Sequence, residues 1–163
     1  SALTSEDIEV PEVLSNLDFV TGGVTVSLFK ENTQRACMGV VHQTNNLVES
    51  LLRAVYHCVK MDDRDGPVNL DELPGLTMNV WLFKELETFN GPESIKIGKH
   101  GLVFLYKEFD SLYLPYIALE QNWNEVKFLE ELCLKAETSK DDWKKEEAEI
   151  YTYETYLLSK RIS

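Results

Sequence analysis

The sequence has few basic residues for its length. In 163 residues, 16 lysines and arginines stand against 28 aspartates and glutamates, so the formal net charge is −12. The first basic residue is Lys30. A field of this sign repels phosphate groups, which disfavours binding to nucleic acid and to anionic membrane surfaces. We therefore expect neither nucleic acid nor a membrane as a partner.

Cysteine is also scarce, and no long apolar run is present. Cys37, Cys58 and Cys133 are widely separated and form no Cys-x-x-Cys pair. An odd number of cysteines without a disulfide pattern is typical of a reducing compartment. No apolar stretch approaches the length of about 20 residues that spans a bilayer, and the acidic beginning lacks the charged-then-apolar order of a signal peptide. We expect a cytoplasmic protein, with the nucleus as the other location.

The composition that is present is that of a folded domain. Hydrophobic residues make up 44% of the sequence and aromatic residues 10%, which excludes wholesale disorder. The length suits one domain with a sizeable core, or two small lobes that share one core. We expect residues 1–21 to be an acidic leader and residues 22–163 to form a single domain.

Hydrophobic periodicity predicts a mixture of strands and helices. Residues 24–28 alternate between apolar and polar, residues 31–33 are turn-like, and residues 34–41 read as a buried strand, so the two strands should pair as a hairpin with the second one central in its sheet. Residues 47–59 carry an apolar stripe at helical spacing. Further strands are expected at 76–83, 102–106 and 147–158, and a further helix from about Asn124. The elements do not alternate regularly, so the expected class is α+β, a compact mixed sheet flanked by helices.

One loop resembles a calcium-binding loop. Counted from Met61, the residues Asp63, Asp65 and Glu72 fall at ligand positions of the EF-hand pattern. Met61 itself occupies the first position, where a thioether is a poor ligand for a hard cation, and Pro74 interrupts the exit helix that the motif needs. The histidines and cysteines lack the paired spacing of zinc sites. No metal and no cofactor is expected.

Cys37 is the strongest candidate for chemistry. A reactive thiolate needs nearby positive charge, and Arg35 would share a strand face with Cys37 and Gly39 because strand side chains alternate. His100 is the candidate acid–base partner if the fold brings it close. The alternative is that Cys37 is a packed structural cysteine, which is the commoner fate of this residue type.

Several motifs together resemble a known family. The run Arg35-Ala36-Cys37-Met38-Gly39 is similar to the Arg-Gly-Cys-Ile-Gly signature of the AMMECR family, named for the Alport syndrome, mental retardation, midface hypoplasia and elliptocytosis chromosomal region. The loop at 62–67 with Glu72-Leu73 resembles the family's Asp-Pro-Arg-Phe-Pro-Pro loop and its Glu-Leu. The remaining matches follow in the family's order: Gly98-Lys99-His100-Gly101-Leu102, Leu114-Pro115 with Trp123, Phe128-Leu129, Cys133, Lys135-Ala136 and Trp143. The resemblance spans roughly residues 24–158.

The chain departs from the family's pattern at specific places. Ala36 replaces a glycine, Asp63, Asp65 and Gly66 replace Pro, Phe and Pro, and Glu137 replaces the glycine expected at a helix end. The resemblance identifies a divergent member. It implies a mixed sheet flanked by helices with a cleft beside the cysteine motif, in a family without an established reaction.

Two functions follow from these residues. In the first, the domain is an intracellular regulatory or binding module, with Arg35, Gly39 and Arg64 as ligand-binding residues and a protein or a small acidic ligand as its partner. In the second, it is a thiol-dependent enzyme in which Cys37 is the nucleophile, Arg35 lowers its pKa or holds a substrate carboxylate, and His100 is the acid–base partner. Within the cysteine motif, Ala36 replaces a glycine and Met38 an isoleucine, and these replacements favour the binding module. The oligomeric state is left open.

Overall fold

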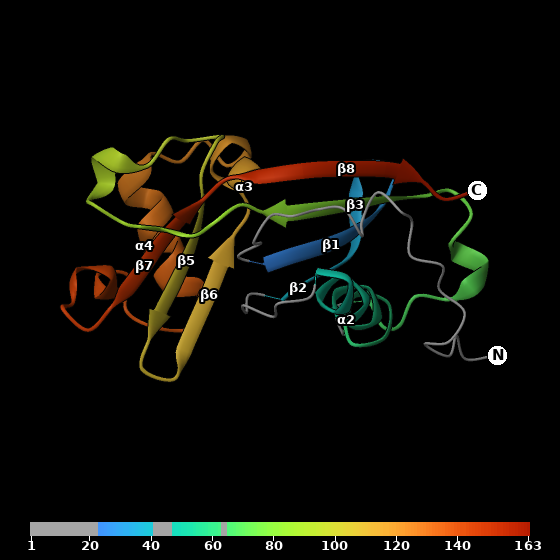
Figure 1. The fold of residues 1–163 in the computed structure, drawn as a ribbon, viewed down its shortest axis with the longest axis horizontal. Helices are drawn as coiled ribbons and strands as arrows, with labels where there is room; N and C mark the ends of the chain where they lie inside the picture. The colour runs from blue at the N-terminus through green and yellow to red at the C-terminus, as the bar shows by residue number, and fades with distance from the viewer. Residues whose placement is uncertain (1–22, 41–46, 63–64) are drawn as a thin grey trace. The chain divides into compact units, whose positions relative to one another are not determined.

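The computed structural model describes residues 23–40, 47–62 and 65–163 (Figure 1). Contacts divide the chain into a first unit, Ser1–Trp81 with Leu158–Ser163, and a second unit, Leu82–Leu157. In chain order the elements are β1 (Gly23–Lys30), β2 (Thr33–Val40), α2 (Leu47–Lys60), the 3₁₀ turn η1 (Leu70–Glu72), β3 (Leu76–Phe83), β4 (Glu87–Thr88), the 3₁₀ turn η2 (Pro92–Ser94), β5 (Gly101–Tyr106), β6 (Phe109–Tyr113), α3 (Pro115–Glu120), α4 (Glu125–Lys135), the 3₁₀ turn η3 (Asp142–Lys144), β7 (Glu149–Tyr153) and β8 (Thr155–Arg161).

The strands form two sheets of four strands each. Sheet A has the order β2-β1-β3-β8 and sheet B the order β4-β7-β5-β6. Strands and helices are mixed without βαβ repetition, which confirms the expected α+β class. No helix in the described part of the chain is both long and apolar enough to cross a bilayer.

The expected hairpin is present, but its second strand is not central. β1 and β2 pair antiparallel around a turn in which Glu31 has φ 55°. The strand that carries Cys37 stands at one end of sheet A, with β1 as its neighbour, so the expectation of a central strand was wrong. Alternation identifies a strand and its buried face, but it carries no information on which strands lie beside it.

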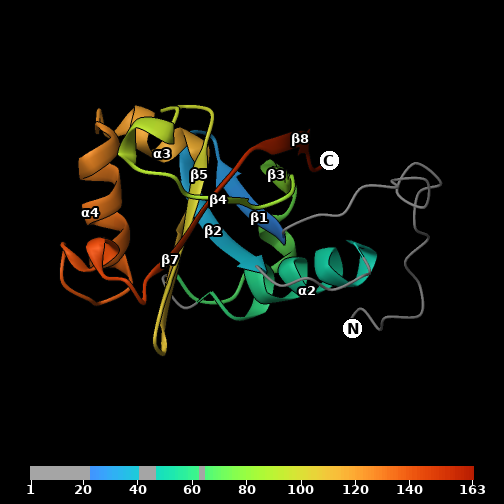
Figure 2. The same cartoon turned by 60° about the vertical axis from the view of Figure 1, so that its left-hand side comes forward.

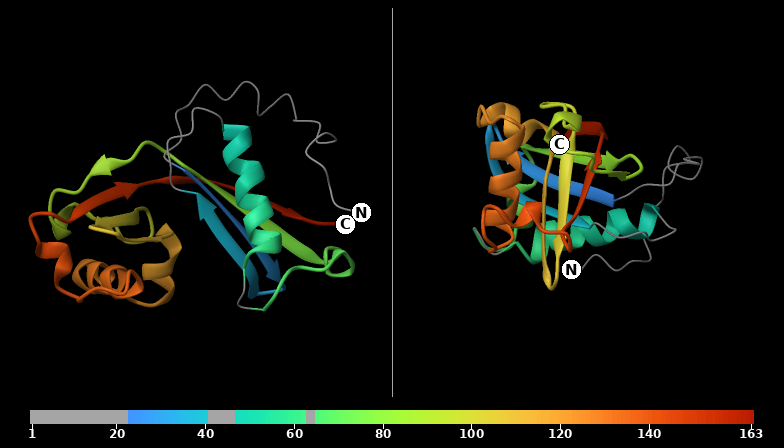
Figure 3. Two further views of the ribbon diagram at one scale, coloured as in Figure 1. Left: turned by 90° about the horizontal axis from the view of Figure 1, so that it is seen from below. Right: turned by 90° about the vertical axis from the view of Figure 1, so that its left-hand side faces the viewer.

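Helix α2 packs on this hairpin, as Figure 3 shows. Its buried residues are Ser50, Ala54 and Cys58, spaced four apart along one face. The larger apolar residues Leu51 and Val55 are half-buried beside them. Small side chains allow the helix to come close to the strands. The buried face of the helix is therefore centred on these small residues and not on the larger apolar residues that hydrophobicity alone predicts. Asn46, the expected N-cap, lies outside the described residues.

In the second unit, α4 packs against β5 and β6 (Figure 2). The expected cap is confirmed, because the Asn124 side chain accepts a hydrogen bond of 2.9 Å from the Lys127 N–H. The core of this unit consists of buried residues from both sheet B and the helices: Ile95, Leu102, Phe104, Ala118, Phe128, Leu129, Leu132, Cys133, Ala136 and Ile150.

The single closing strand expected at 147–158 is two strands. β7 belongs to sheet B and β8 to sheet A, and Glu154 stands between them. The Glu154 carboxylate binds Lys84 at 3.0 Å and Lys99 at 3.1 Å, and its carbonyl accepts from the Lys84 N–H. These contacts fix the residue at which the chain passes from one sheet to the other, and a count of alternating apolar residues cannot detect such a change.

Candidate functional site

Arg35 occupies a β-bulge in β2. Leu28 pairs with Ala36 and Phe29 pairs with Gln34, so Arg35 is the extra residue opposite that step of β1. A bulge interrupts strict alternation and re-aims the side chain it carries. Alternation alone therefore does not determine the face on which the Arg35 side chain lies, and its shared face with Cys37 and Gly39 stays a prediction.

The Arg35 guanidinium binds the loop that follows α2. Nε and Nη2 donate to the two carboxylate oxygens of Glu72 at 2.9 and 3.1 Å, Nη1 donates to the Gly66 carbonyl at 3.1 Å and Nη2 to the Pro67 carbonyl at 3.2 Å. Only 13% of the side chain is exposed. The fork geometry of arginine suits a carboxylate bound through both oxygens. We call this arrangement the Arg35 clamp.

The clamp changes the acid–base properties of both partners. Hydrogen bonding from Arg35, reinforced by the backbone N–H of Asn69, lowers the pKa of Glu72 from 4.5 to about 2. The bond to Glu72 raises the pKa of Arg35. The Asn69 N–H donates to Glu72 at 2.8 Å, which closes the capping box of the short turn η1. Glu72 is thus ionised over the whole physiological range and holds the loop in place.

A second contact fastens the same loop beside Cys37. The Cys37 N–H donates to the Asp62 carboxylate at 2.7 Å, and the Ser27 hydroxyl donates to the Cys37 sulfur at 3.0 Å. Asp62 is 6% exposed and Ser27 is fully buried, whereas Cys37 is intermediate. Two segments that the sequence analysis singled out separately, the cysteine motif and the acidic loop, are therefore joined by Asp62 and by the Arg35 clamp.

Gly39 has a packing role in the hairpin. It pairs with Thr25 across the two strands, and a Cβ at this position would lie 2.6 Å from the Thr25 hydroxyl oxygen. Thr25 is 2% exposed, and its hydroxyl has no hydrogen-bond partner within the described ranges. A side chain at Gly39 would force this buried hydroxyl to move. The expected ligand-binding role of Gly39 stays a prediction.

His100 lies in the second unit, while Arg35 and Cys37 lie in the first. Its Nδ1 accepts a hydrogen bond of 3.2 Å from the Lys96 N–H, and the residue is 8% exposed. Burial lowers the pKa of His100 below its usual 6.5, so the ring is neutral at physiological pH and carries its proton on Nε2. The pairing of His100 with Cys37 stays a prediction.

The remaining candidates concern cations and ligands. Arg64 and Asp63 lie outside the described residues. Asp65 is exposed, and both oxygens of Glu72 are bound to Arg35. In the described ranges, no group of three or more His, Cys, Asp or Glu side chains is arranged to hold a metal ion.

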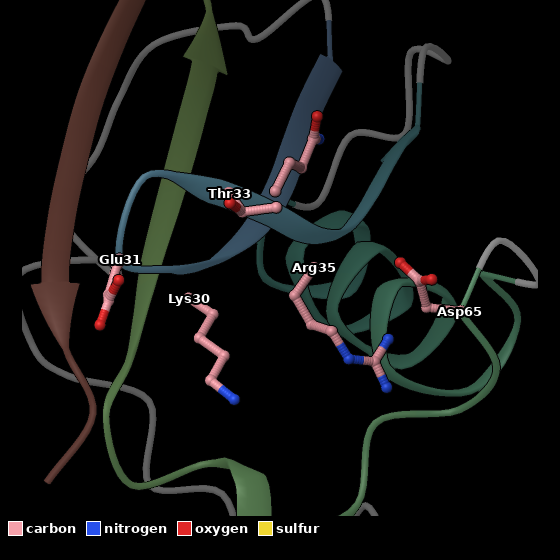
Figure 4. Close-up of a pocket in the computed structure, with 6 residues that line it drawn as sticks. Lys30, Glu31, Thr33, Arg35 and Asp65 are labelled. Carbon is pink, nitrogen blue, oxygen red and sulfur yellow. The ribbon is translucent and has the colours of Figure 1, made fainter.

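A pocket of about 310 Å³ adjoins the clamp. Its lining consists of polar or charged residues: Lys30, Glu31, Thr33, Gln34, Arg35 and Asp65. Figure 4 shows Lys30 and Arg35 extending on the same side of the hairpin, with Asp65 on the loop beyond Arg35. Of these residues the sequence analysis found only Arg35 as a ligand-binding candidate. The signal for Lys30, Glu31, Thr33 and Gln34 was their position in or beside the turn directly before the cysteine motif, whereas Asp65 belongs to the acidic loop after α2.

Comparison with known proteins gives relatives over almost the whole chain. A protein of Nanoarchaeum equitans is 31% identical over 96% of this chain and 91% of its own length. A protein of Aquifex aeolicus is 31% identical over 94% of this chain and 82% of its own length. The crystal structure of an uncharacterised protein from Pyrococcus horikoshii superposes with a TM-score of 0.85 at 28% identity, covering 98% of this chain and 83% of that one. The sequence model of the AMMECR1 family matches residues 3–158, and the chain therefore belongs to the AMMECR1 family.

Proposed function

We propose that this chain is a binding module without catalytic activity, and that the pocket beside the Arg35 clamp takes a small ligand carrying a carboxylate. The carboxylate comes from a free acid or from an acidic side chain of a partner protein. The proposal includes a cytoplasmic or nuclear location, which rests on three cysteines without a disulfide pattern.

The Arg35 clamp is the observation that carries this proposal. All three guanidinium nitrogens donate to groups of the chain itself, and Glu72 neutralises the charge. An arginine that activates a thiol or holds a substrate carboxylate needs charge and donors that are not already bound. Arg35 instead fixes one wall of a preformed pocket, as a binding site requires.

Lys30 supplies the charge that recognises the ligand. It lines the pocket and forms no ion pair with any residue that the structure describes. Thr33 and Gln34 belong to the same lining, and a hydroxyl and an amide are groups that can donate to a carboxylate. The overall charge of −12 opposes large anions, so a ligand with one or two acidic groups fits best.

The state of His100 also favours binding over acid–base catalysis. Its Nδ1 lone pair already accepts the Lys96 N–H, and its other nitrogen is protonated. A general base needs an available lone pair directed at the proton that it removes. His100 meets that requirement only after the contact with Lys96 is broken.

One observation favours a second function based on the thiol. Ser27 donates a hydrogen bond to the Cys37 sulfur, and this contact with a buried hydroxyl holds the thiol in one position. Cys37 is also half-exposed, while Cys58 and Cys133 are fully buried. If Cys37 is a nucleophile, iodoacetamide should alkylate it faster than a model thiol below about pH 8, where ordinary thiols are mostly protonated.

The binding function is tested by titration with N-acetyl-glutamate, which carries two carboxylates, followed by amide chemical shifts. We expect shifts in the turn between β1 and β2, and about tenfold weaker binding in Lys30→Gln, because a charge-assisted hydrogen bond is lost. The matched control is Lys60→Gln, which removes the charge of an exposed lysine at the end of α2. Cys37→Ser should bind the ligand like the unchanged chain.

Two results would contradict the proposal. One is equal weakening in Lys30→Gln and Lys60→Gln, which would mean that only net charge matters. The other is complete loss of binding in Cys37→Ser together with fast alkylation of Cys37, which would favour the thiol function.

A further inference from the structure

The pocket beside the Arg35 clamp contains charges of both signs, all within the first unit. Two positive and two negative residues belong to its lining: Lys30, Arg35, Glu31 and Asp65. Glu72 adds a third negative charge, because both of its oxygens are bound to Arg35. Asp63 and Arg64, which precede Asp65 in the sequence, bring one charge of each sign and leave the balance unchanged. The surroundings of the pocket therefore carry an excess of one negative charge.

This balance restricts the kind of molecule that the pocket can take. A carboxylate on the ligand is attracted to Lys30, but every further negative charge meets Glu31 and Asp65. An anion without a positive group therefore gains attraction at one place and meets repulsion at another. A ligand that carries a positive group beside its carboxylate meets opposite charge at both groups.

The carboxylate end of the pocket is defined by two residues of the hairpin. Lys30 and Thr33 are partners across β1 and β2 at the turn. Directly opposed side chains lie on the same face of a sheet, with their Cβ atoms about 5 Å apart. One residue with an ammonium group and one with a hydroxyl therefore stand together, and both kinds of group donate hydrogen bonds to a carboxylate.

Asp65 defines the other end of the pocket. It directly precedes Gly66 and Pro67, whose carbonyls accept hydrogen bonds from Arg35 at 3.1 and 3.2 Å. The clamp therefore anchors the loop immediately beside Asp65. Figure 4 shows Arg35 between Lys30 and Asp65. A positive group of the ligand is accordingly expected at Asp65, apart from the carboxylate at Lys30.

Glu31 is a less suitable partner for that positive group. It lies in the turn itself, with φ 55°, and follows Lys30 directly in the chain. A positive group at Glu31 would therefore also meet the ammonium of Lys30. Asp65 comes from a different segment, the loop after α2, and is free of this conflict.

We propose that the pocket takes a free amino acid, whose carboxylate is bound at Lys30 and whose ammonium is bound at Asp65. The inference rests on the proposed function and names its ligand more closely. A volume of about 310 Å³ lies at the low end of the range of about 300–1,000 Å³ for ligand pockets, which suits a small molecule. An acidic side chain of a partner protein brings no ammonium and would leave Asp65 without an opposite charge.

Two probes that differ in the positive group test the inference. L-Glutamate and N-acetyl-L-glutamate carry the same two carboxylates, but acetylation removes the ammonium. We expect the amide shifts of Thr33 and Gln34 to saturate at about fivefold lower concentration with L-glutamate, a difference that one exposed ion pair can make. In Asp65→Asn the two probes should bind about equally. An effect of the acetyl group itself would persist in this variant, so the part of the preference that is lost reports the charge.

The controls use residues of the same unit. Asp71→Asn removes the same charge from an exposed residue outside the pocket lining and should keep the fivefold preference. Glu31→Gln should also keep most of it. Lys30→Gln should weaken both probes alike, because it removes the partner of the carboxylate that they share.

The inference is overturned if both probes bind the unchanged chain equally, or if the preference for L-glutamate survives Asp65→Asn. It is also overturned if Glu31→Gln removes the preference in place of Asp65→Asn. Equal binding that Lys30→Gln weakens would leave the proposed function in place and refute only the amino-acid ligand. Shifts with neither probe, or shifts that Lys30→Gln leaves unchanged, would refute the proposed function itself.

Discussion

Gly101 should not tolerate even a methyl group. A Cβ at this position would lie 2.6 Å from the Tyr153 hydroxyl oxygen and 2.7 Å from Cε1, and closer still to Cζ. The Tyr153 ring cannot easily retreat, because it stacks on Phe83 at 4.1 Å between centroids and donates to the Tyr113 carbonyl at 2.9 Å. Gly101 follows His100 in the family signature. In this fold the position requires glycine because the Tyr153 ring occupies the space that a side chain would need.

The magnitude of the effect follows from two terms. Forcing an extra carbon into a packed core destabilises a protein by about 1–3 kcal/mol. If the ring moves and the Tyr113 carbonyl loses its partner, about 1 kcal/mol more is lost. We therefore expect Gly101→Ala to lower the free energy of unfolding by about 2–4 kcal/mol, a large part of the 5–15 kcal/mol typical of a folded domain.

Urea unfolding of Gly101→Ala, followed by tryptophan fluorescence, measures this loss as a lower midpoint. The control is the same substitution in a Tyr153→Ala background, where the ring that causes the conflict is absent. In that background Gly101→Ala should change the free energy of unfolding by less than about 0.5 kcal/mol. Without the Tyr153 ring the added methyl group has nothing to collide with, so the loss seen in the unchanged chain should disappear. A similar loss in both backgrounds, or no loss in either, would show that the Tyr153 ring is not what excludes a side chain.

Three further predictions concern the first unit and its thiols. The pKa of Glu72 is lowered to about 2, so the stability it contributes is fully present above pH 4.5 and is lost as the pH falls from 4.5 toward 2. Urea midpoints measured across this range should show the acid-sensitive component in the unchanged chain and not in Glu72→Gln, and Arg35→Lys should reduce it because lysine cannot bind both carboxylate oxygens. In the folded chain a disulfide reagent should modify Cys37 first, while Cys58 and Cys133 should react only in denaturant. Both are fully buried, and burial raises the pKa of Cys133 to about 11. Equal rates for all three thiols would contradict this packing. Calorimetry should detect no micromolar calcium binding, because both oxygens of Glu72 are bound to Arg35, and a saturable calcium signal that Glu72→Gln abolishes would refute this prediction.

The sequence predicted those elements whose signal is local. The pairing of β1 with β2 followed from alternation around a polar turn, and the start of α4 from Asn124 ahead of an apolar stripe. Both signals lie within a few residues of the feature that they predict. The family resemblance likewise rested on short motifs whose order the chain preserves.

The features that the sequence did not reveal depend on contacts between distant residues. The bulge at Arg35 is visible only once Leu28 and Phe29 are paired with their partners. The Arg35–Glu72 bond joins positions 37 residues apart, and neither residue alone indicates it. The change of sheet at Glu154 depends on Lys84 and Lys99, which a periodicity count over residues 147–158 does not include.

The two ends of sheet A differ in a way that limits how the protein can assemble. At β2, the chain covers its own edge, because Asp62 accepts the Cys37 N–H and the Arg35 clamp holds the loop alongside. At β8, β3 is the one neighbouring strand among the described residues. Runaway fibre growth by strand addition needs two open edges, one to accept a strand and one to offer the next. A strand that adds to β2 beside Cys37 must first displace Asp62 from the N–H of that residue, so this end of sheet A is protected against the edge-to-edge pairing that fibre growth requires.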